Sequence, residues 1–142
     1  MKIPKCVRIA TTLALLSGCA GCSTLPKTDL EEFQGTWQGR EMNGRTEGVC
    51  RLIITGEAVE FRGANTNEWY MGTFSLRQDT TPSQVIAAIT QCSFQQYMGK
   101  IVHGIYRLDG HALTYTANEP GNPEVPLAFD SLGSRRFELR KQ

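Results

Sequence analysis

The sequence predicts an all-β domain, an antiparallel up-and-down barrel of about eight strands. From Trp37 to the C-terminus, apolar and polar residues alternate with a period of two in short runs, as half-buried strands require. Turn residues such as Gly56-Glu57 and Asp109-Gly110 separate these runs at nearly even intervals. A sandwich of the same strands also fits. Because most links are short hairpins, we favour a meander that removes its edges by closing into a barrel.

One helical turn is expected before the strands, since Thr28 and Glu31 have the spacing of a capping box. It would cover residues 29–34. The period-two runs then predict strands over residues 37–41, 49–55, 58–62, 68–76, 84–94, 101–108, 111–117 and 135–141. Residues 126–131 are a candidate for a further short strand.

Three details of this strand plan depend on local residues. Asn43-Gly44 predicts a tight hairpin turn, because both residues tolerate positive φ. Residues 85–89 fit a helix or a strand, and the alternation that follows them favours a strand. In the Asp109-Gly110 hairpin we expect Leu108 to face His111.

The N-terminal residues have the arrangement of a bacterial lipoprotein signal. Three basic residues precede an apolar run over residues 9–16, which is too short to span a bilayer. Leu16-Ser17-Gly18 then leads to Cys19, whose thiol would take the lipid (palmitate among its acyl chains) before cleavage. The alternative is an ordinary secretory signal in which this cysteine is incidental.

This interpretation divides the chain into three parts. Residues 1–18 are the lipoprotein signal peptide, residues 19–32 a lipid-anchored tether, and residues 33–142 the barrel domain. The protein would lie in the cell envelope. Ala20 after the cysteine suggests the outer membrane, facing the periplasm or the surface, by analogy with enteric sorting.

Charge restricts the partners. The full chain has a net charge of +1, and removing the three basic residues of the signal leaves −2. A near-neutral domain argues against a nucleic-acid partner and against polybasic binding to lipid headgroups. The expected membrane contact is therefore the N-terminal lipid, while an envelope protein partner cannot be named from the residues.

The cysteines suggest one disulfide. An exported protein can form such bonds, and Cys50 and Cys92 both lie in predicted strands. We expect them to pair, the alternative being two buried free thiols. Cys22 would lie in the tether without an assigned partner.

Two segments carry a resemblance to known proteins. Gly35-Thr36-Trp37 resembles the Gly-x-Trp signature that opens the first strand of lipocalin-type barrels. Together with the hairpin over residues 104–110, it resembles a family of small exported lipocalin-like bacterial domains of uncharacterised function. The resemblance implies a calyx-like barrel in which Trp37 plugs the closed end. It also implies that a basic residue of the last strand covers the indole, and Arg140 is our choice over Arg135 and Arg136.

No residue pattern indicates catalysis, a metal or a cofactor. His103 and His111 flank one hairpin turn without being register partners, and no nucleophile, dinucleotide or phosphate-loop motif is present. Several aromatic residues could line a ligand cavity or simply fill the core. These candidates are Trp69, Tyr70, Phe74, Phe94 and Tyr106.

We therefore expect a non-enzymatic, lipid-anchored binding protein that holds a small apolar or amphipathic molecule in its barrel. The alternative is a protein-interaction or inhibitor lipoprotein with a solid core and binding loops. An enzyme on a barrel scaffold is the least supported option.

Overall fold

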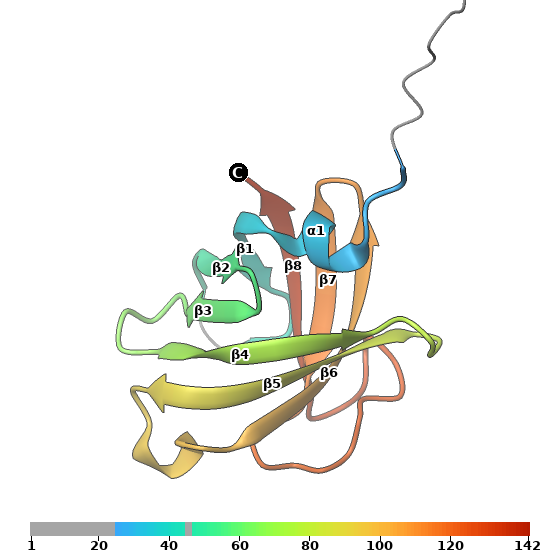
Figure 1. Cartoon of the computed structure of the whole chain (residues 1–142). Helices are drawn as coiled ribbons and strands as arrows, with labels where there is room; N and C mark the ends of the chain where they lie inside the picture. The colour runs from blue at the N-terminus through green and yellow to red at the C-terminus, as the bar shows by residue number, and fades with distance from the viewer. Residues whose placement is uncertain (1–24, 45–46) are drawn as a thin grey trace, which may run out of the picture.

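Eight strands close into one antiparallel barrel (Figure 1). The computed structural model describes residues 25–44 and 47–142, so the predicted signal peptide and Cys19 lie outside the described residues. Each strand pairs with its neighbours in chain order, and the last strand pairs with the first. The predicted fold class, an up-and-down lipocalin-like barrel with a short N-terminal helical turn, is confirmed. No helix within the described ranges is long and apolar enough to cross a bilayer.

The strand bounds agree with the period-two pattern to within two residues at each end. The residues that were ambiguous between helix and strand form β5, which pairs with β4 across a bulge at Met71/Gly72. The elements are α1 (Asp29–Phe33), β1 (Gly35–Glu41), β2 (Cys50–Thr55), β3 (Ala58–Arg62), β4 (Trp69–Arg77), β5 (Ser83–Cys92), the 3₁₀ turn η1 (Gln95–Tyr97), β6 (Ile101–Asp109), β7 (Ala112–Ala117) and β8 (Arg135–Lys141).

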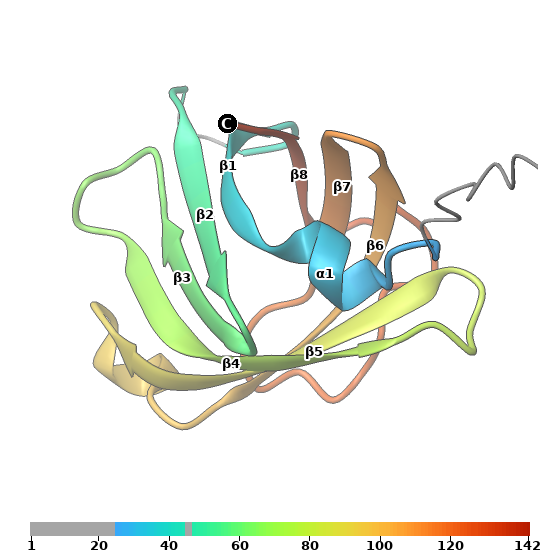
Figure 2. The same ribbon diagram turned by 45° about the horizontal axis from the view of Figure 1, so that its top comes forward.

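The helix α1 begins with the predicted capping box. The Thr28 hydroxyl accepts a hydrogen bond from the Glu31 amide, and the Glu31 carboxylate accepts one from the Thr28 amide at 2.7 Å. Gly35 then turns the chain into β1 with a φ of 114°, a conformation that is costly for residues with a Cβ. This turn lays α1 across one end of the barrel (Figure 2).

Two predicted details of the connections are wrong. Asn43 does not form a tight turn with positive φ. Its side chain instead binds the start of β8, donating to the Ser134 carbonyl at 2.7 Å and accepting from the Arg136 amide at 2.9 Å. Residues 126–131 form no strand, since β7 and β8 already have a neighbour on each side and the closed barrel offers no free edge.

The hairpin between β6 and β7 has a different register from the predicted one. Leu108 pairs with Leu113, and Asp109 pairs with Ala112. The turn residues are therefore Gly110 and His111, because Gly110 supplies the positive φ of 58°. The shift is by two residues, so every side chain keeps the face that the period-two pattern gives it.

The closed end is plugged by Trp37, but Lys141 covers it rather than Arg140. The indole is fully buried and donates from Nε1 to the Phe33 carbonyl at 2.8 Å. Lys141 is the register partner of Trp37 on β8, so the two side chains share the inner face. The Lys141 ammonium lies 5.1 Å from the indole centroid and donates to the Glu32 carbonyl at 2.7 Å. Arg140 pairs with Gln38 and is exposed on the outer face.

The predicted disulfide is absent, because Cys50 and Cys92 are both free thiols. Cys50 lies on β2 and Cys92 on β5, with β3 and β4 between them. At about 4.8 Å per strand, the separation along the sheet is roughly 14 Å, twice what a disulfide can bridge. Each thiol instead lies against a backbone carbonyl, Cys50 against Gly39 at 3.5 Å and Cys92 against Phe94 at 3.0 Å.

Candidate functional site: an apolar cavity in the barrel

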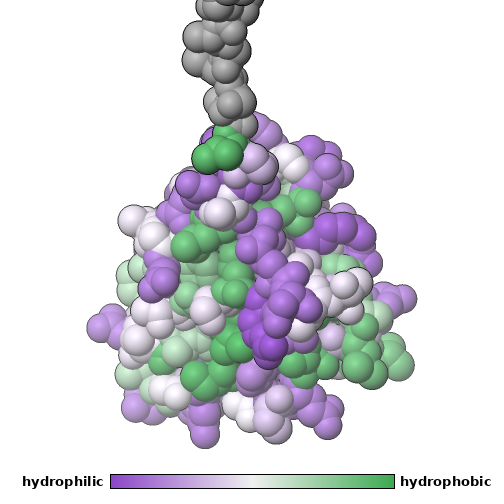
Figure 3. All heavy atoms as spheres, turned by 45° about the vertical axis from the view of Figure 1, so that its right-hand side comes forward, coloured by the Kyte–Doolittle hydropathy of each residue, from purple (hydrophilic) through white to green (hydrophobic). Residues whose placement is uncertain are grey.

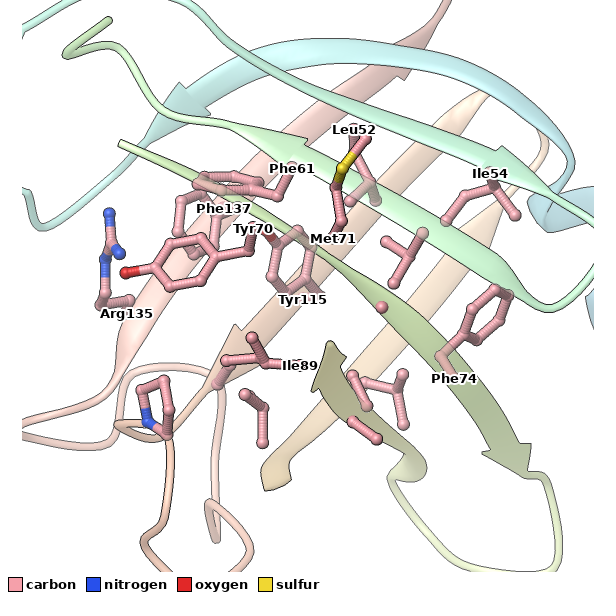
Figure 4. A pocket seen from close by; sticks show the side chains of 18 of the residues that line it. Leu52, Ile54, Phe61, Tyr70, Met71, Phe74, Ile89, Tyr115, Arg135 and Phe137 are labelled. Atoms are coloured by element: carbon pink, nitrogen blue, oxygen red, sulfur yellow. The ribbon is translucent and has the colours of Figure 1, made fainter. Parts of the chain in front are cut away.

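A cavity of about 160 Å³ lies inside the barrel (Figure 4). Its walls come from α1 and from strands β2 to β8, and its side chains are almost all apolar. The alternation in the sequence explains this lining. Leu52 pairs with Phe61, and Phe61 pairs with Tyr70, so that one face of three successive strands points inward.

Small residues leave the space unfilled. Gly72 and Ala87 lie on neighbouring strands, and Ala117 lies on β7 at the wall of the same cavity. Larger side chains at Ala87 and Ala117 would occupy the volume, since an eight-stranded barrel is just wide enough to be filled by its own side chains. A Cβ on Gly72 would instead meet the backbone carbonyl of Ala88 on the neighbouring strand. The cavity is therefore a consequence of residue size at a few inward positions.

Two of the five aromatic candidates line the cavity. Tyr70 and Phe74 project into it from β4. Trp69 alternates with Tyr70 and lies on the outer face, where the Arg62 guanidinium lies 5.7 Å from the indole centroid. Phe94 follows β5 and packs beside Tyr70, with ring centroids 6.2 Å apart.

The fifth candidate, Tyr106, belongs to the closed end. It packs edge-on against Phe33, and its hydroxyl donates to the Asp29 carboxylate at 2.6 Å. Tyr115 lies in the cavity wall, where Tyr106 was expected. This residue pairs with Tyr106 and Phe137 and lines the cavity from β7. Its inward position could have been found by carrying the alternation of Leu113 one step further along the strand.

An ion-pair cluster lies at the end of the cavity away from α1. Arg135 is sandwiched between two carboxylates, with Nε and Nη2 each 2.8 Å from Glu41 and Nη1 bound to Glu68. Its guanidinium also lies over the ring of Phe137, 5.1 Å from the centroid. Burial disfavours the charged form of Arg135, but the hydrogen bonds to both carboxylates outweigh it and raise the pKa, so the side chain stays cationic.

Two tyrosine hydroxyls in the cavity wall have no hydrogen-bond partner among the described residues. Tyr97 donates to Glu119 and Tyr106 to Asp29, but Tyr70 and Tyr115 have no such acceptor. Burial raises the pKa of Tyr70 to about 12, with the nearby charge of Glu68 adding to the effect. Burial likewise raises the pKa of Tyr115 well above its ordinary value, so both groups are neutral hydroxyls at physiological pH. Unpaired hydroxyls in an apolar wall are the polar groups that a ligand can satisfy.

The spacing of the His, Cys, Asp and Glu side chains decides whether the barrel could hold a metal ion. Among residues 25–44 and 47–142, no cluster of three or more His, Cys, Asp or Glu side chains could hold a metal ion. His103 pairs with Ile86 in the middle of β6, and His111 lies in the hairpin turn, so the structure does not bring the two histidines together.

Fold and cavity together define the class: a small calycin-like barrel of the kind that binds ligands. No protein-family model, curated protein or solved structure matches the chain significantly. The class therefore rests on the strand order, the closure between β1 and β8, and the apolar interior. The resemblance to exported lipocalin-like bacterial domains stays a prediction.

Proposed function

We propose that this protein is a non-enzymatic, lipid-anchored lipoprotein of the cell envelope whose barrel binds a small apolar or amphipathic molecule. The observation that carries the proposal is the apolar cavity with the unpaired Tyr70 and Tyr115 hydroxyls in its wall. An apolar body would be bound by the walls, and a polar group would find partners at the end near Arg135. This division of labour is typical of small-molecule sites.

The cavity volume limits the ligand. About 160 Å³ is below the roughly 300–1,000 Å³ of pockets for drug-sized molecules. It is close to the roughly 150 Å³ of an engineered protein cavity that binds benzene. We infer a ligand whose buried part is one ring or one short alkyl chain.

The position of the N-terminal segment supports an orientation on the membrane. The described chain enters at the closed end, where α1 covers the barrel (Figure 1), while Tyr70 and Arg135 lie at the other end of the cavity (Figure 4). A lipid on Cys19 would therefore hold the closed end toward the bilayer. We call the end of the cavity at Tyr70 and Arg135 the mouth. It would face away from the membrane, where a soluble ligand can reach it.

Ligand binding can be tested by filling the cavity. We expect Ala87→Leu, which places a larger side chain in the cavity wall, to abolish binding of 1-hexanol measured by NMR chemical-shift changes. Ala58→Leu, on the exposed start of β3, is the matched control and should bind like the wild type. If both variants bind 1-hexanol equally, the molecule is not held in this cavity.

Anchoring can be tested separately. We expect Cys19→Ser to leave the protein unprocessed or soluble, because no other acylation site is proposed for the mature chain. The measurement is fractionation of cells, followed by mass analysis of the N-terminus. Normal cleavage with retention in the membrane fraction would show that the lipid assignment is wrong.

An interaction role is the second candidate. Figure 3 shows apolar residues distributed among polar ones over one face of the barrel. Leu127 and Leu132, both in the long connection between β7 and β8, are fully exposed. A loop that presents leucines to water is a candidate contact with an envelope protein. A Leu127→Ser/Leu132→Ser variant that keeps 1-hexanol binding but loses a cross-link formed in intact cells would favour this role.

A further inference from the structure

We propose that the ligand of this cavity is a cationic amphiphile, a short apolar body carrying an ammonium group that lies at the Arg135 end. The inference rests on the proposed function, since it names the chemistry of the molecule that the cavity would hold. Three observations carry it: the saturation of Arg135, the charge balance around the mouth, and the aromatic residues on the rim.

Arg135 would ordinarily suggest an anionic ligand such as a fatty-acid carboxylate. Here its Nε, Nη1 and Nη2 already donate to Glu41 and Glu68. Its face is covered by Phe137 at 5.1 Å and Phe61 at 6.0 Å. An incoming carboxylate would have to displace one of two carboxylates from a partly buried, charge-assisted network. The guanidinium is thus a structural part of the mouth.

The ion-pair cluster at the mouth is net negative. The cluster of one guanidinium and two carboxylates carries a net charge of −1. Glu119 adds a second negative charge on the rim, where it accepts a hydrogen bond from Tyr97 at 2.6 Å. Outside the cluster, the exposed side chain of Lys100 lies beside Gly121. Two arginines at the same end of the strands are each paired with a carboxylate, Arg62 with Glu60 and Arg136 with Glu138. The side chains of Glu41 and Glu68 are only 16 % exposed, so solvent screens their charge less than that of Lys100.

Three aromatic rings pack together at the mouth, one of them Tyr70 of the cavity wall. Tyr70, Phe94 and Tyr97 pack with centroids 6.1–6.4 Å apart. An aromatic face attracts a cation through its quadrupole and repels an anion, and ammonium ligands are commonly recognised in this way. The Tyr70 hydroxyl, which has no partner among the described residues, can accept a hydrogen bond from an ammonium N–H.

A series of ligands with one tail and different heads tests the inference. Hexylammonium, 1-hexanol and hexanoate present a cation, a neutral hydroxyl and an anion on matched chains. Titrating the wild-type protein at neutral pH and low salt should show hexylammonium binding about tenfold more tightly than hexanoate, with 1-hexanol between them. Added NaCl should narrow this ratio. Equal affinities, or tighter binding of hexanoate, would overturn the cationic assignment while leaving ligand binding intact.

Variants of single carboxylates test which residues cause the preference for hexylammonium over hexanoate. Glu68→Gln and Glu119→Gln each remove one negative charge at the mouth and should lower the ratio of hexylammonium to hexanoate affinity several-fold. Glu60→Gln is the matched control, since Glu60 pairs with Arg62 on the outer face of β3. Glu119 lies on an exposed loop, so its variant remains informative if Glu68→Gln disturbs folding. An unchanged ratio in Glu119→Gln and in a folded Glu68→Gln overturns the inference, whereas failure of all three ligands to bind overturns the proposed function beneath it.

Discussion

Lys141 shows how one residue of the last strand completes the closed end. Its ammonium lies over the indole of Trp37 and donates to the Glu32 carbonyl, so it joins β8, β1 and the end of α1. Arg140, the adjacent residue, has the same charge and faces solvent. Position on the strand therefore decides which cation stabilises the barrel, because neighbouring residues point to opposite faces.

Lys141 and Arg140 should contribute differently to the free energy of unfolding. Lys141→Ala removes a cation–π contact and a charged hydrogen bond, and should lower the free energy of unfolding by about 1–3 kcal/mol. Arg140→Ala removes an exposed side chain and should change it by less than about 0.5 kcal/mol. Urea unfolding of both variants measures the difference. Equal losses would show that the contact with Trp37 contributes nothing.

At the scale of elements, α1 covers the closed end of the barrel and is held there by polar contacts. Tyr106 of β6 donates to Asp29, and the Gln34 side chain binds both the amide and the carbonyl of Gly56 in the β2–β3 turn. These contacts are needed because a helix of five residues has little stability of its own. The last residues of the predicted tether thus fold onto the barrel.

The start of this helix should depend on pH. The pKa of Glu31 is lowered by the hydrogen bonds from the Thr28 amide and then from the Thr28 hydroxyl. A lowered pKa in the folded state means that the capping box is fully formed above the ordinary Glu value of 4.5 and is lost as the pH falls through the lower folded value. We expect the Thr28 amide NMR signal to titrate with Glu31 in that acidic range.

Glu31→Gln is the matched control for the pH effect. Glutamine at this position can still accept the Thr28 amide hydrogen bond but does not titrate. The Thr28 amide signal should then lose its pH dependence. A titration that persists in this variant would have to come from another group.

At the scale of the whole molecule, the barrel depends on a close approach between its two ends. β1 and β8 form the seam, and Gly39 pairs there with Leu139. A Cβ on Gly39 would overlap the backbone carbonyl of Glu138. Glycine at this position lets the first and last strands come within hydrogen-bonding distance.

Gly39→Ala should therefore destabilise the barrel by about 1–3 kcal/mol or open the seam. Gly110→Ala is the comparison, because it has open space around it and only the cost of its positive φ, about 1 kcal/mol. Urea unfolding compares the two. Hydrogen exchange of the β8 amides should increase only in Gly39→Ala, and unchanged exchange there would contradict the role of the seam.

The features that could be predicted from the sequence depend on residues that are close together in the chain. The capping box joins residues three apart, and the alternation that puts Leu52 and Ile54 on one face belongs to a single strand. Strand bounds, the α1 start and the closed meander followed from such neighbouring residues. Of the proposed cavity residues, Tyr70 and Phe74 line the cavity, but Trp69 does not, because alternation fixes which residues share a face without saying which face is inside.

The sequence by itself determined where strands begin and end and that they form hairpins in order, since these features depend on residues close in the chain. Only the tertiary structure decided the rest. The pairing of Trp37 with Lys141 depends on the seam between the chain's two ends, and the separation of Cys50 from Cys92 depends on the two strands that lie between them. The cavity depends on how side-chain volumes from different strands add up around Ala87 and Ala117, and no local pattern records that sum.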